Sequence, residues 1–222
     1  MSSSDVFVSW SGGKDSVFSA YEAIRKGYNV SYLLNFIRED GRSYHGFWSD
    51  LLVAQSNAIG IPILQIKTTW EGWEEKLKNT MRELKQEGIE GAVFGDECFI
   101  EHKEWVENIC NELKVRPLLP LWGNKPMELL SRYVNDSVKA IIVAVNPKLS
   151  KEWLGRTVDE EFLDYLRDNN IRPCTDAGEY HTFVVDGPMF KRYIKIVDGK
   201  KVKVEDGWWF LDVLKYEVVE KE

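Results

Sequence analysis

Short apolar runs alternate with amphipathic stretches through the first half of the chain. The runs rich in apolar and β-branched residues predict strands at 6–10, 30–37, 61–66, 91–94 and 115–119. Apolar residues at helical spacing predict helices at 15–26, 47–59, 73–86 and 100–113. This alternation of strand and helix predicts a parallel sheet with helices on both faces.

After Gly123 the pattern changes. Helical spacing at 125–134 and 159–168 is interleaved with strand-like runs at 140–145, 182–185, 192–197 and 208–214. Asp198-Gly199 lies between two alternating runs and predicts a hairpin turn. We therefore expect an α/β fold with a parallel-sheet domain at 1–123 and a smaller α+β domain at 124–222. No Pro-, Gly- or Ser-rich linker separates them, which predicts that the two domains pack closely.

The most informative polar segment follows the first predicted strand and reads Ser11-Gly12-Gly13-Lys14-Asp15-Ser16. Adjacent glycines let backbone amides approach an anion, and the N-terminus of the following helix favours negative charge. Lys14 adds a positive charge, the serine hydroxyls add donors, and Asp15 could hold Mg²⁺ or orient the loop. A Walker A loop would need glycine at position 8, where Val8 stands. The segment predicts a phosphate site, and the alternative is a strand-to-helix turn without a ligand.

Polar residues also end the second and fourth predicted strands. Asn35 lies near the end of 30–37, and Gly95-Asp96 follows 91–94. Carboxyl ends of parallel strands meet at one edge of a sheet, so these residues and the glycine loop are expected to converge on one crevice. Asp96 could hold Mg²⁺ or a substrate amine, although an N-cap of the next helix is the alternative. Trp70 and Trp73, in contrast, are interpreted as the packed start of a helix.

A third polar segment reads Gly178-Glu179-Tyr180-His181 and leads into a strand-like run. Glu179 and His181 alternate with Tyr180, which predicts that their side chains point the same way. A carboxylate and an imidazole on one side can transfer protons or bind a cationic or amide substrate. The alternative is a hydrogen-bonded pair that caps the strand.

Charge and cysteine content limit the class of protein. The formal net charge is −7, which argues against a nucleic-acid partner. The three cysteines form no CxxC pair, so a disulfide framework or a zinc site is not expected, and a reducing compartment is the simpler interpretation. No apolar stretch approaches the roughly 20 residues that span a bilayer. Together these features predict a cytoplasmic protein with no membrane partner.

The segment at 11–16 resembles the PP-loop of the N-type ATP pyrophosphatases, which cleave ATP between the α and β phosphates. Further motifs narrow this resemblance. In chain order they are Gly95-Asp96, His102 with Trp105-Val106-Glu107, then 117–122, 153–156, 178–183 and 186–188. In this order they resemble the diphthine–ammonia ligase family over nearly the whole chain. Ala177 and Lys103 depart from the residues that the family commonly shows at these positions.

The resemblance implies a Rossmann-like parallel sheet in an adenine nucleotide alpha hydrolase-like PP-loop domain that binds ATP at 1–123, and a smaller substrate-binding domain at 124–222. It implies ATP-dependent amidation of diphthine, the modified histidine of elongation factor 2, with release of AMP and pyrophosphate through an acyl-adenylate. ATP and Mg²⁺ are the implied cofactors. We expect ammonium as the nitrogen donor, since the chain begins without a nucleophilic cysteine and has no room for a glutaminase domain.

On this chain the implied nucleotide contacts are Ser9, Ser11, Gly12, Gly13, Lys14, Asp15, Ser16, Asn35 and Gly95. The expected catalytic residues are Lys14, Asp15, Asp96, Glu179 and His181, with Asp15 and Asp96 as the Mg²⁺ ligands. Arg156 is a candidate for holding a carboxylate or a phosphate.

Two other functions remain open from the sequence. One is a PP-loop enzyme that modifies tRNA, either a thiolase or a lysidine-type ligase. Thiolation usually needs paired cysteines, and the acidic balance disfavours tRNA. The other is a non-catalytic nucleotide-binding regulatory module, which would not need Lys14, Asp15 or the Glu179–His181 segment. The sequence does not decide whether the protein forms a homo-oligomer.

Overall fold

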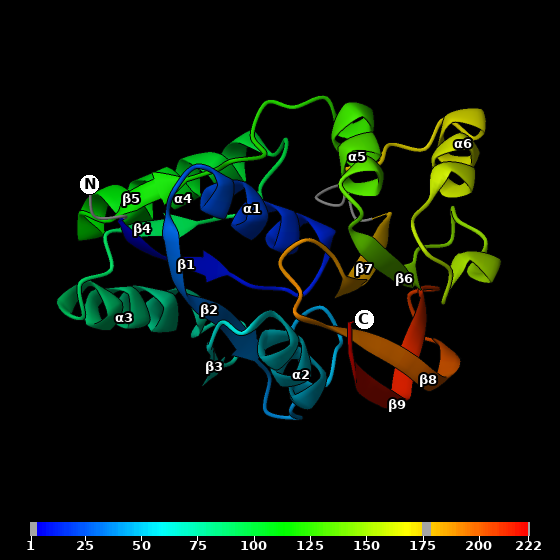
Figure 1. The fold of residues 1–222 in the computed structure, drawn as a ribbon, viewed down its shortest axis with the longest axis horizontal. Helices are drawn as coiled ribbons and strands as arrows, with labels where there is room; N and C mark the ends of the chain where they lie inside the picture. Colours follow the sequence, from blue (N-terminus) through cyan, green and yellow to red (C-terminus); the bar gives the residue numbers. More distant parts are fainter. Residues whose placement is uncertain (1–3, 175–178, 222) are drawn as a thin grey trace.

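The computed structural model describes residues 4–174 and 179–221 (Figure 1). Its strands are β1 (Asp5–Ser9), β2 (Asn29–Ile37), β3 (Ile63–Lys67), β4 (Gly91–Val93), β5 (Arg116–Leu118), β6 (Lys139–Val145), β7 (Tyr180–Asp186), β8 (Arg192–Lys203) and β9 (Trp209–Glu220). Its helices are α1 (Lys14–Arg25), α2 (Ser49–Ile59), α3 (Trp73–Gln86), α4 (Ile100–Leu113), α5 (Pro126–Asn135) and α6 (Glu160–Asp168), with a 3₁₀ turn η1 (Lys151–Trp153). No helix in the described part of the chain is long and apolar enough to cross a membrane.

The first sheet has the parallel order β3-β2-β1-β4-β5, which confirms the predicted α/β architecture. The chain builds outward from β1 to β3 and then returns to β4 on the other side of β1. The strand order therefore reverses between β1 and β4. In open sheets of this kind, ligands bind in the crevice at the carboxyl ends of the strands where the order reverses.

Helices cover both faces of this sheet because its strands are apolar on both sides. Val6 and Val8 are buried in the same cluster as the apolar residues of α1 and α2. Phe7 points to the opposite face, since side chains alternate along a strand, and lies in a second cluster with α3 and α4. The sheet is thus the middle layer of a three-layer domain.

The second sheet is antiparallel, in the order β7-β6-β9-β8, and α5 and α6 pack against it (Figure 1). The buried cluster that contains α1 and α2 continues without a break into Leu129 of α5, Phe162 of α6, and Ile142 and Phe183 of this sheet. One apolar core therefore joins the two sheets. The sequence predicted this close packing, because no Pro-, Gly- or Ser-rich linker separates the two domains.

The prediction of a hairpin turn at Asp198-Gly199 is wrong. Both residues lie inside β8, which pairs with β9 as far as Lys203 and Trp209. The register shifts at Asp198-Gly199, so this segment forms a bulge, and a Cβ on Gly199 would lie 3.1 Å from the Asp212 carbonyl oxygen. The turn itself lies at 204–208, where Gly207 has a φ of 90°.

Candidate active site

The loop between β1 and α1 is held in one shape by glycine and by short hydrogen bonds. Gly12 has a φ of 80°, and a Cβ there would lie 2.5 Å from Leu52 Cδ2. The Ser16 hydroxyl donates to the Gly13 carbonyl at 3.1 Å, and the Ser11 hydroxyl donates to Ser16 Oγ at 3.1 Å. The loop is therefore built around a position that only glycine fits.

Strand β7 of the second domain lies directly against this loop. The Val184 amide donates to the Gly12 carbonyl at 2.9 Å, and the Lys14 amide donates to Thr182 Oγ1 at 3.0 Å. The fully buried Gln55 amide donates to the carbonyls of Gly12 at 3.0 Å and Val184 at 2.7 Å. The shape of the loop thus depends on both domains.

A cavity of about 270 Å³ opens at the carboxyl edge of the first sheet. Among its lining residues are the predicted contacts Ser9, Ser11, Asp15, Ser16, Asn35, Gly95 and Asp96. The structure therefore brings the polar ends of β1, β2 and β4 together in one crevice. Gly12, Gly13, Lys14, Glu179 and His181 are not part of its lining.

Asn35 carries an acceptor without a partner in this cavity. Its Nδ2 donates to the Trp10 carbonyl at 2.7 Å, which fixes the amide orientation. Its Oδ1 is buried and accepts no hydrogen bond from the described residues. Because buried polar atoms are nearly always paired, this oxygen fits a ligand that brings a donor, such as the amino group of adenine.

Aromatic side chains form another wall of the cavity. Tyr44, Trp70 and Trp73 all contribute to its lining, and the Trp70 and Trp73 rings stack with centroids 6.5 Å apart. The interpretation of these tryptophans as only a packed helix start missed this exposure to the cavity. A signal was present in the sequence, because Trp70 follows β3 in the same way that Asn35 and Gly95 mark the ends of their strands.

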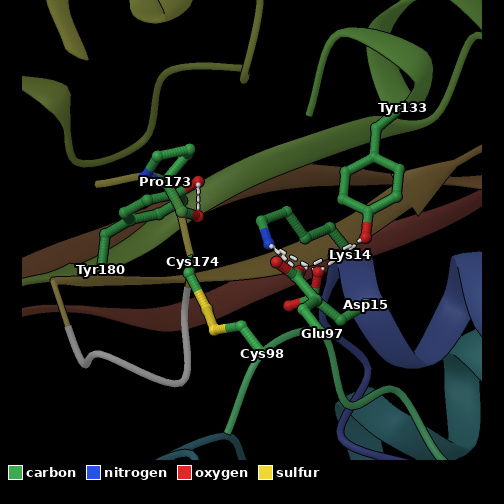
Figure 2. Close-up of a disulfide and its surroundings, with 8 residues drawn as sticks. All are labelled: Lys14, Asp15, Glu97, Cys98, Tyr133, Pro173, Cys174 and Tyr180. Carbon is green, nitrogen blue, oxygen red and sulfur yellow. Dashed lines mark hydrogen bonds and ion pairs between the residues drawn. A yellow bond between two sulfur atoms is a disulfide. The ribbon is translucent and has the colours of Figure 1, made fainter. Parts of the chain in front are cut away.

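Behind the loop, Lys14 lies in a buried cluster of charged and hydroxyl groups (Figure 2). Its Nζ is 2.5 Å from Asp15 Oδ1 and 3.3 Å from Glu97 Oε1, and the Tyr133 hydroxyl donates to Asp15 Oδ1 at 2.9 Å. Burial opposes the charge of Lys14, but the Asp15 carboxylate, with a smaller contribution from Glu97 once it ionises, outweighs burial and raises the Lys14 pKa. Burial and the nearby Asp15 raise the pKa of Glu97 to about 9, so Glu97 is protonated at neutral pH. The sequence did not predict Glu97 or Tyr133 as members of the site.

A disulfide joins Cys98 to Cys174 beside this cluster, although the sequence led us to expect no disulfide framework (Figure 2). The two residues are 76 positions apart, one after β4 and the other before β7. They meet only because the two domains pack together, so spacing could not reveal the pair. Cys110 is free and buried, and burial raises the pKa of its thiol to about 11.

Asp96 is paired with a histidine rather than with a helix end. Its carboxylate contacts His102 Nδ1 from a nearly buried position. The alternative of an N-cap is wrong, because the N-cap of α4 is Phe99. His102 stacks on Trp105 at 5.1 Å, so its ring is held against the aromatic wall.

Glu179 and His181 take part in separate contacts. Glu179 accepts a hydrogen bond from Asn146 and another from Lys148 at 2.8 Å. Burial alone would raise the pKa of Glu179, but these hydrogen bonds lower it. His181 stacks on Trp208 at 5.4 Å, and burial lowers its pKa to about 3, so the ring is neutral. Gly178, which opens this motif, lies outside the described residues.

Two further predictions concern Arg156 and Mg²⁺. Arg156 Nη2 is 2.5 Å from Glu161 Oε2 at an exposed position, and Arg156 does not line the cavity at the carboxyl edge of the first sheet. Within 4–174 and 179–221, no group of three or more His, Cys, Asp or Glu could hold a metal ion. Asp15 and Asp96 both line the cavity at the carboxyl edge of the first sheet, and such a pair fits Mg²⁺ that takes its other ligands from phosphate oxygens.

A parallel sheet with a glycine loop at its switch point, clamped by an antiparallel domain, defines an α/β protein of the PP-loop type. Residues 4–117 match the family model of the diphthamide synthase N-terminal domain, and 125–219 match that of the C-terminal domain. The chain belongs to the diphthamide synthase family.

Three proteins of similar sequence share the name diphthine–ammonia ligase. The human diphthine–ammonia ligase is 27% identical, covering 91% of this chain and 86% of its own length. The mouse diphthine–ammonia ligase is 28% identical, covering 86% and 82%. The Schizosaccharomyces pombe diphthine–ammonia ligase is 25% identical over 89% of this chain but only 37% of its own length.

A solved structure also resembles this fold. It is described as a predicted subunit of a tRNA methyltransferase from Methanocaldococcus jannaschii, and it superposes with a TM-score of 0.50. It covers 82% of this chain and 97% of its own, at 18% identity. At this identity the likeness supports the fold alone.

Proposed function

We propose that this protein is an ATP-dependent diphthine–ammonia ligase. It joins ammonium to the carboxylate of diphthine on elongation factor 2 and releases AMP and pyrophosphate. Family membership and the shared name of the relatives support this activity. The observation that carries the proposal is the cavity at the β1–β4 switch point, where the polar ends of three strands and the glycine loop converge.

In this proposal the cavity holds ATP. The Ser9 hydroxyl donates to a phosphate oxygen, and the Ser11 and Ser16 hydroxyls exchange their hydrogen bonds within the loop for phosphate oxygens when ATP binds. Gly12 and Gly13, which do not line the cavity, shape the loop behind these serines. Asn35 Oδ1 accepts from the adenine amino group, which satisfies its unpaired position. Asp15 and Asp96 hold Mg²⁺, which supplies positive charge at the phosphates. Gly95 lets the end of β4 lie directly against the start of α1, since a Cβ there would lie 3.0 Å from the Asp15 backbone.

Lys14 acts through Asp15 in this account. The sequence predicted that Lys14 neutralises phosphate directly, yet its ammonium contacts Asp15 and Glu97. We propose that Lys14 and the Tyr133 hydroxyl orient the Asp15 carboxylate toward the cavity. Glu97, held protonated, adds no second negative charge to the cluster at neutral pH.

The reaction runs in two steps. A carboxylate oxygen of diphthine attacks the α-phosphorus, the bond to the bridging oxygen breaks, and its electron pair leaves with pyrophosphate. Ammonia then attacks the acyl carbon of the adenylate and expels AMP, which leaves an amide. The neutral His181 ring, with its lowered pKa, lies on the acceptor side as a hydrogen-bonding group, and Glu179 fixes the start of β7 through Asn146 and Lys148.

The proposal also assigns domains and location. Residues 1–123 bind ATP and 124–222 bind the acceptor, supported by the two sheets. We propose that the protein works in the cytoplasm, where ATP and elongation factor 2 are both present, with no nucleic-acid partner. The fold likeness to the tRNA methyltransferase subunit does not favour an RNA substrate, because it rests on 18% identity.

Product analysis tests the proposed function. Purified protein is given Mg·ATP, ammonium and elongation factor 2 that carries diphthine. We expect AMP and pyrophosphate in equal amounts, with both substrates required, and no turnover when glutamine replaces ammonium. The matched control replaces diphthine by unmodified histidine in the same factor. Formation of ADP, or turnover that needs tRNA instead, would overturn the proposal.

A further inference from the structure

A second cavity of about 320 Å³ lies beside the nucleotide cavity, between the segment 38–47 and the last two strands. Its lining includes Arg38 and Arg42 from the first domain and Phe210 and Asp212 from β9. Tyr44 and His45 line both cavities. The two cavities therefore meet at these two side chains, and a group held in one lies next to the other.

The cavity is preformed because its loop is pinned. Antiparallel bridges join Ile37 to Ser43 and Arg42 to Trp48, and the Arg38 amide donates to the Arg42 carbonyl at 2.7 Å. Ser43 is fully buried. A site whose walls are already fixed loses little entropy when a ligand enters.

Each of the two arginines forms an ion pair, and the pair that Arg42 makes lies within the cavity wall. Arg42 lies 3.1 Å from Asp212 Oδ1, donates to the Gly46 carbonyl at 3.0 Å and stacks over the Trp48 ring at 3.9 Å. This arginine and Asp212 neutralise each other and form part of the wall. Arg42 is therefore a structural element of the cavity wall.

Arg38 differs, because it carries a donor without a partner. Its Nη2 is 2.9 Å from the exposed Asp40, but its Nε is buried and donates to no atom of the described residues. A buried guanidinium donor left unpaired is costly, so it points to an acceptor that arrives with a ligand. Asp212 Oδ1 is also buried without a hydrogen bond, so the cavity offers Arg38 Nε to a carboxylate and Asp212 to a donor of the same ligand.

Aromatic rings complete the wall on the side of the second domain. His181 lies edge-on to His45 at 5.6 Å and stacks on Trp208, which in turn stacks on Phe210 at 6.0 Å. Of these rings, those of His45 and Phe210 line the cavity and give a planar, heterocyclic group a surface on which to stack, while His181 and Trp208 pack against them. The volume of about 320 Å³ is enough for one long side chain.

We infer that this second cavity binds the acceptor side chain, an imidazole-bearing chain that ends in a carboxylate, with Arg38 Nε donating to that carboxylate. The inference rests on the proposed function and deepens it, since it says where the acceptor binds. Arg38 holds the carboxylate at the junction marked by Tyr44 and His45, facing the nucleotide cavity. Arg38 is then a specificity residue for the acceptor and has no part in binding ATP.

Direct binding of a small probe tests this inference without turnover. The probe is imidazole-4-propionate, which combines an imidazole with a carboxylate, and its binding is followed by NMR titration and by soaking crystals. We expect it in the second cavity of the wild-type protein. Arg38→Met should weaken it about tenfold, as expected for loss of a hydrogen bond to a charged group. Arg82→Met, which removes an exposed guanidinium on α3, serves as the control and should change nothing.

Kinetics provide the second readout. With the diphthine-bearing factor, Arg38→Met should raise the KM for the acceptor about tenfold and leave the KM for ATP unchanged. Equal probe binding by wild type and Arg38→Met, or a probe bound elsewhere, would overturn the inference. An equal rise of both KM values would also overturn it. Failure of the proposed function is distinguishable, since the probe would then bind as expected while no AMP forms.

Discussion

At the scale of single residues, the unpaired Asn35 Oδ1 makes the most specific statement about the ligand. An acceptor at this position favours a base with an amino group, so it predicts discrimination between adenine and guanine nucleotides. Asn35→Ala should raise the KM for ATP about tenfold and reduce the preference for ATP over GTP. Asn79→Ala on the exposed face of α3 is the control. Unchanged ATP/GTP selectivity in Asn35→Ala would contradict the assignment.

Glu97 predicts a dependence of stability on pH. Its pKa is raised from 4.5 to about 9 in the folded chain, so between these values the folded state holds a proton that the unfolded state has released. This contribution to stability is present at low pH and is lost as the pH rises toward 9. Glu97→Gln cannot lose the proton, so the variant should gain stability relative to wild type from pH 5 to pH 9.

Urea unfolding at pH 5, 7 and 9 measures this effect. The exposed Glu90→Gln provides the control, for which the difference from wild type should stay constant. A constant difference for Glu97→Gln as well would show that Glu97 is ionised in the folded protein.

At the scale of elements, two glycines with the same φ angle allow the stability cost of side-chain crowding to be separated from the cost of backbone strain. Gly12 and Gly41 both have a φ of 80°, but a Cβ on Gly12 meets Leu52 at 2.5 Å whereas a Cβ on Gly41 meets nothing within 4 Å. Gly41→Ala should cost about 1 kcal/mol of backbone strain. Gly12→Ala should cost about 2–4 kcal/mol, because overpacking adds to the strain. Similar costs for the two variants, measured by denaturant unfolding, would contradict the packing of the loop.

Element boundaries were largely predictable because apolar periodicity decides them. The helices α3 and α4 begin and end where the sequence predicted. The hairpin prediction at Asp198-Gly199 failed because the same dipeptide suits a bulge, and pairing with β9 on both sides keeps the strand continuous. Local turn chemistry could not distinguish these outcomes without the partner strand.

At the scale of the whole molecule, the site depends on contacts between domains that no local pattern contains. The polar ends of β1, β2 and β4 could be predicted to meet, because parallel strands share an edge. The bonds from Lys14 to Thr182 and from Gln55 to Val184 could not, since they depend on how the second domain docks. The cluster around Glu97 has the same origin.

The disulfide between Cys98 and Cys174 ties these two domains together and predicts a stability that depends on redox conditions. Each disulfide is broken by two thiols of a reductant, which leave as their own disulfide. Reduction should lower the free energy of unfolding by about 2–4 kcal/mol, given that the bond closes a long loop. The double variant Cys98→Ser/Cys174→Ser should show the lower stability with and without dithiothreitol. A wild type that is equally stable in both conditions would contradict this.

The fate of the acceptor's own oxygen is the most direct test of the central claim, which is activation of a carboxylate on ATP for amide formation. Elongation factor 2 is prepared with ¹⁸O in both oxygens of the diphthine carboxylate and is converted with Mg·ATP and ammonium. We predict one ¹⁸O in the phosphate of each AMP, because the attacking oxygen stays on the α-phosphorus when ammonia displaces the adenylate. Unlabelled AMP, or label in pyrophosphate or in inorganic phosphate beside ADP, would contradict the account.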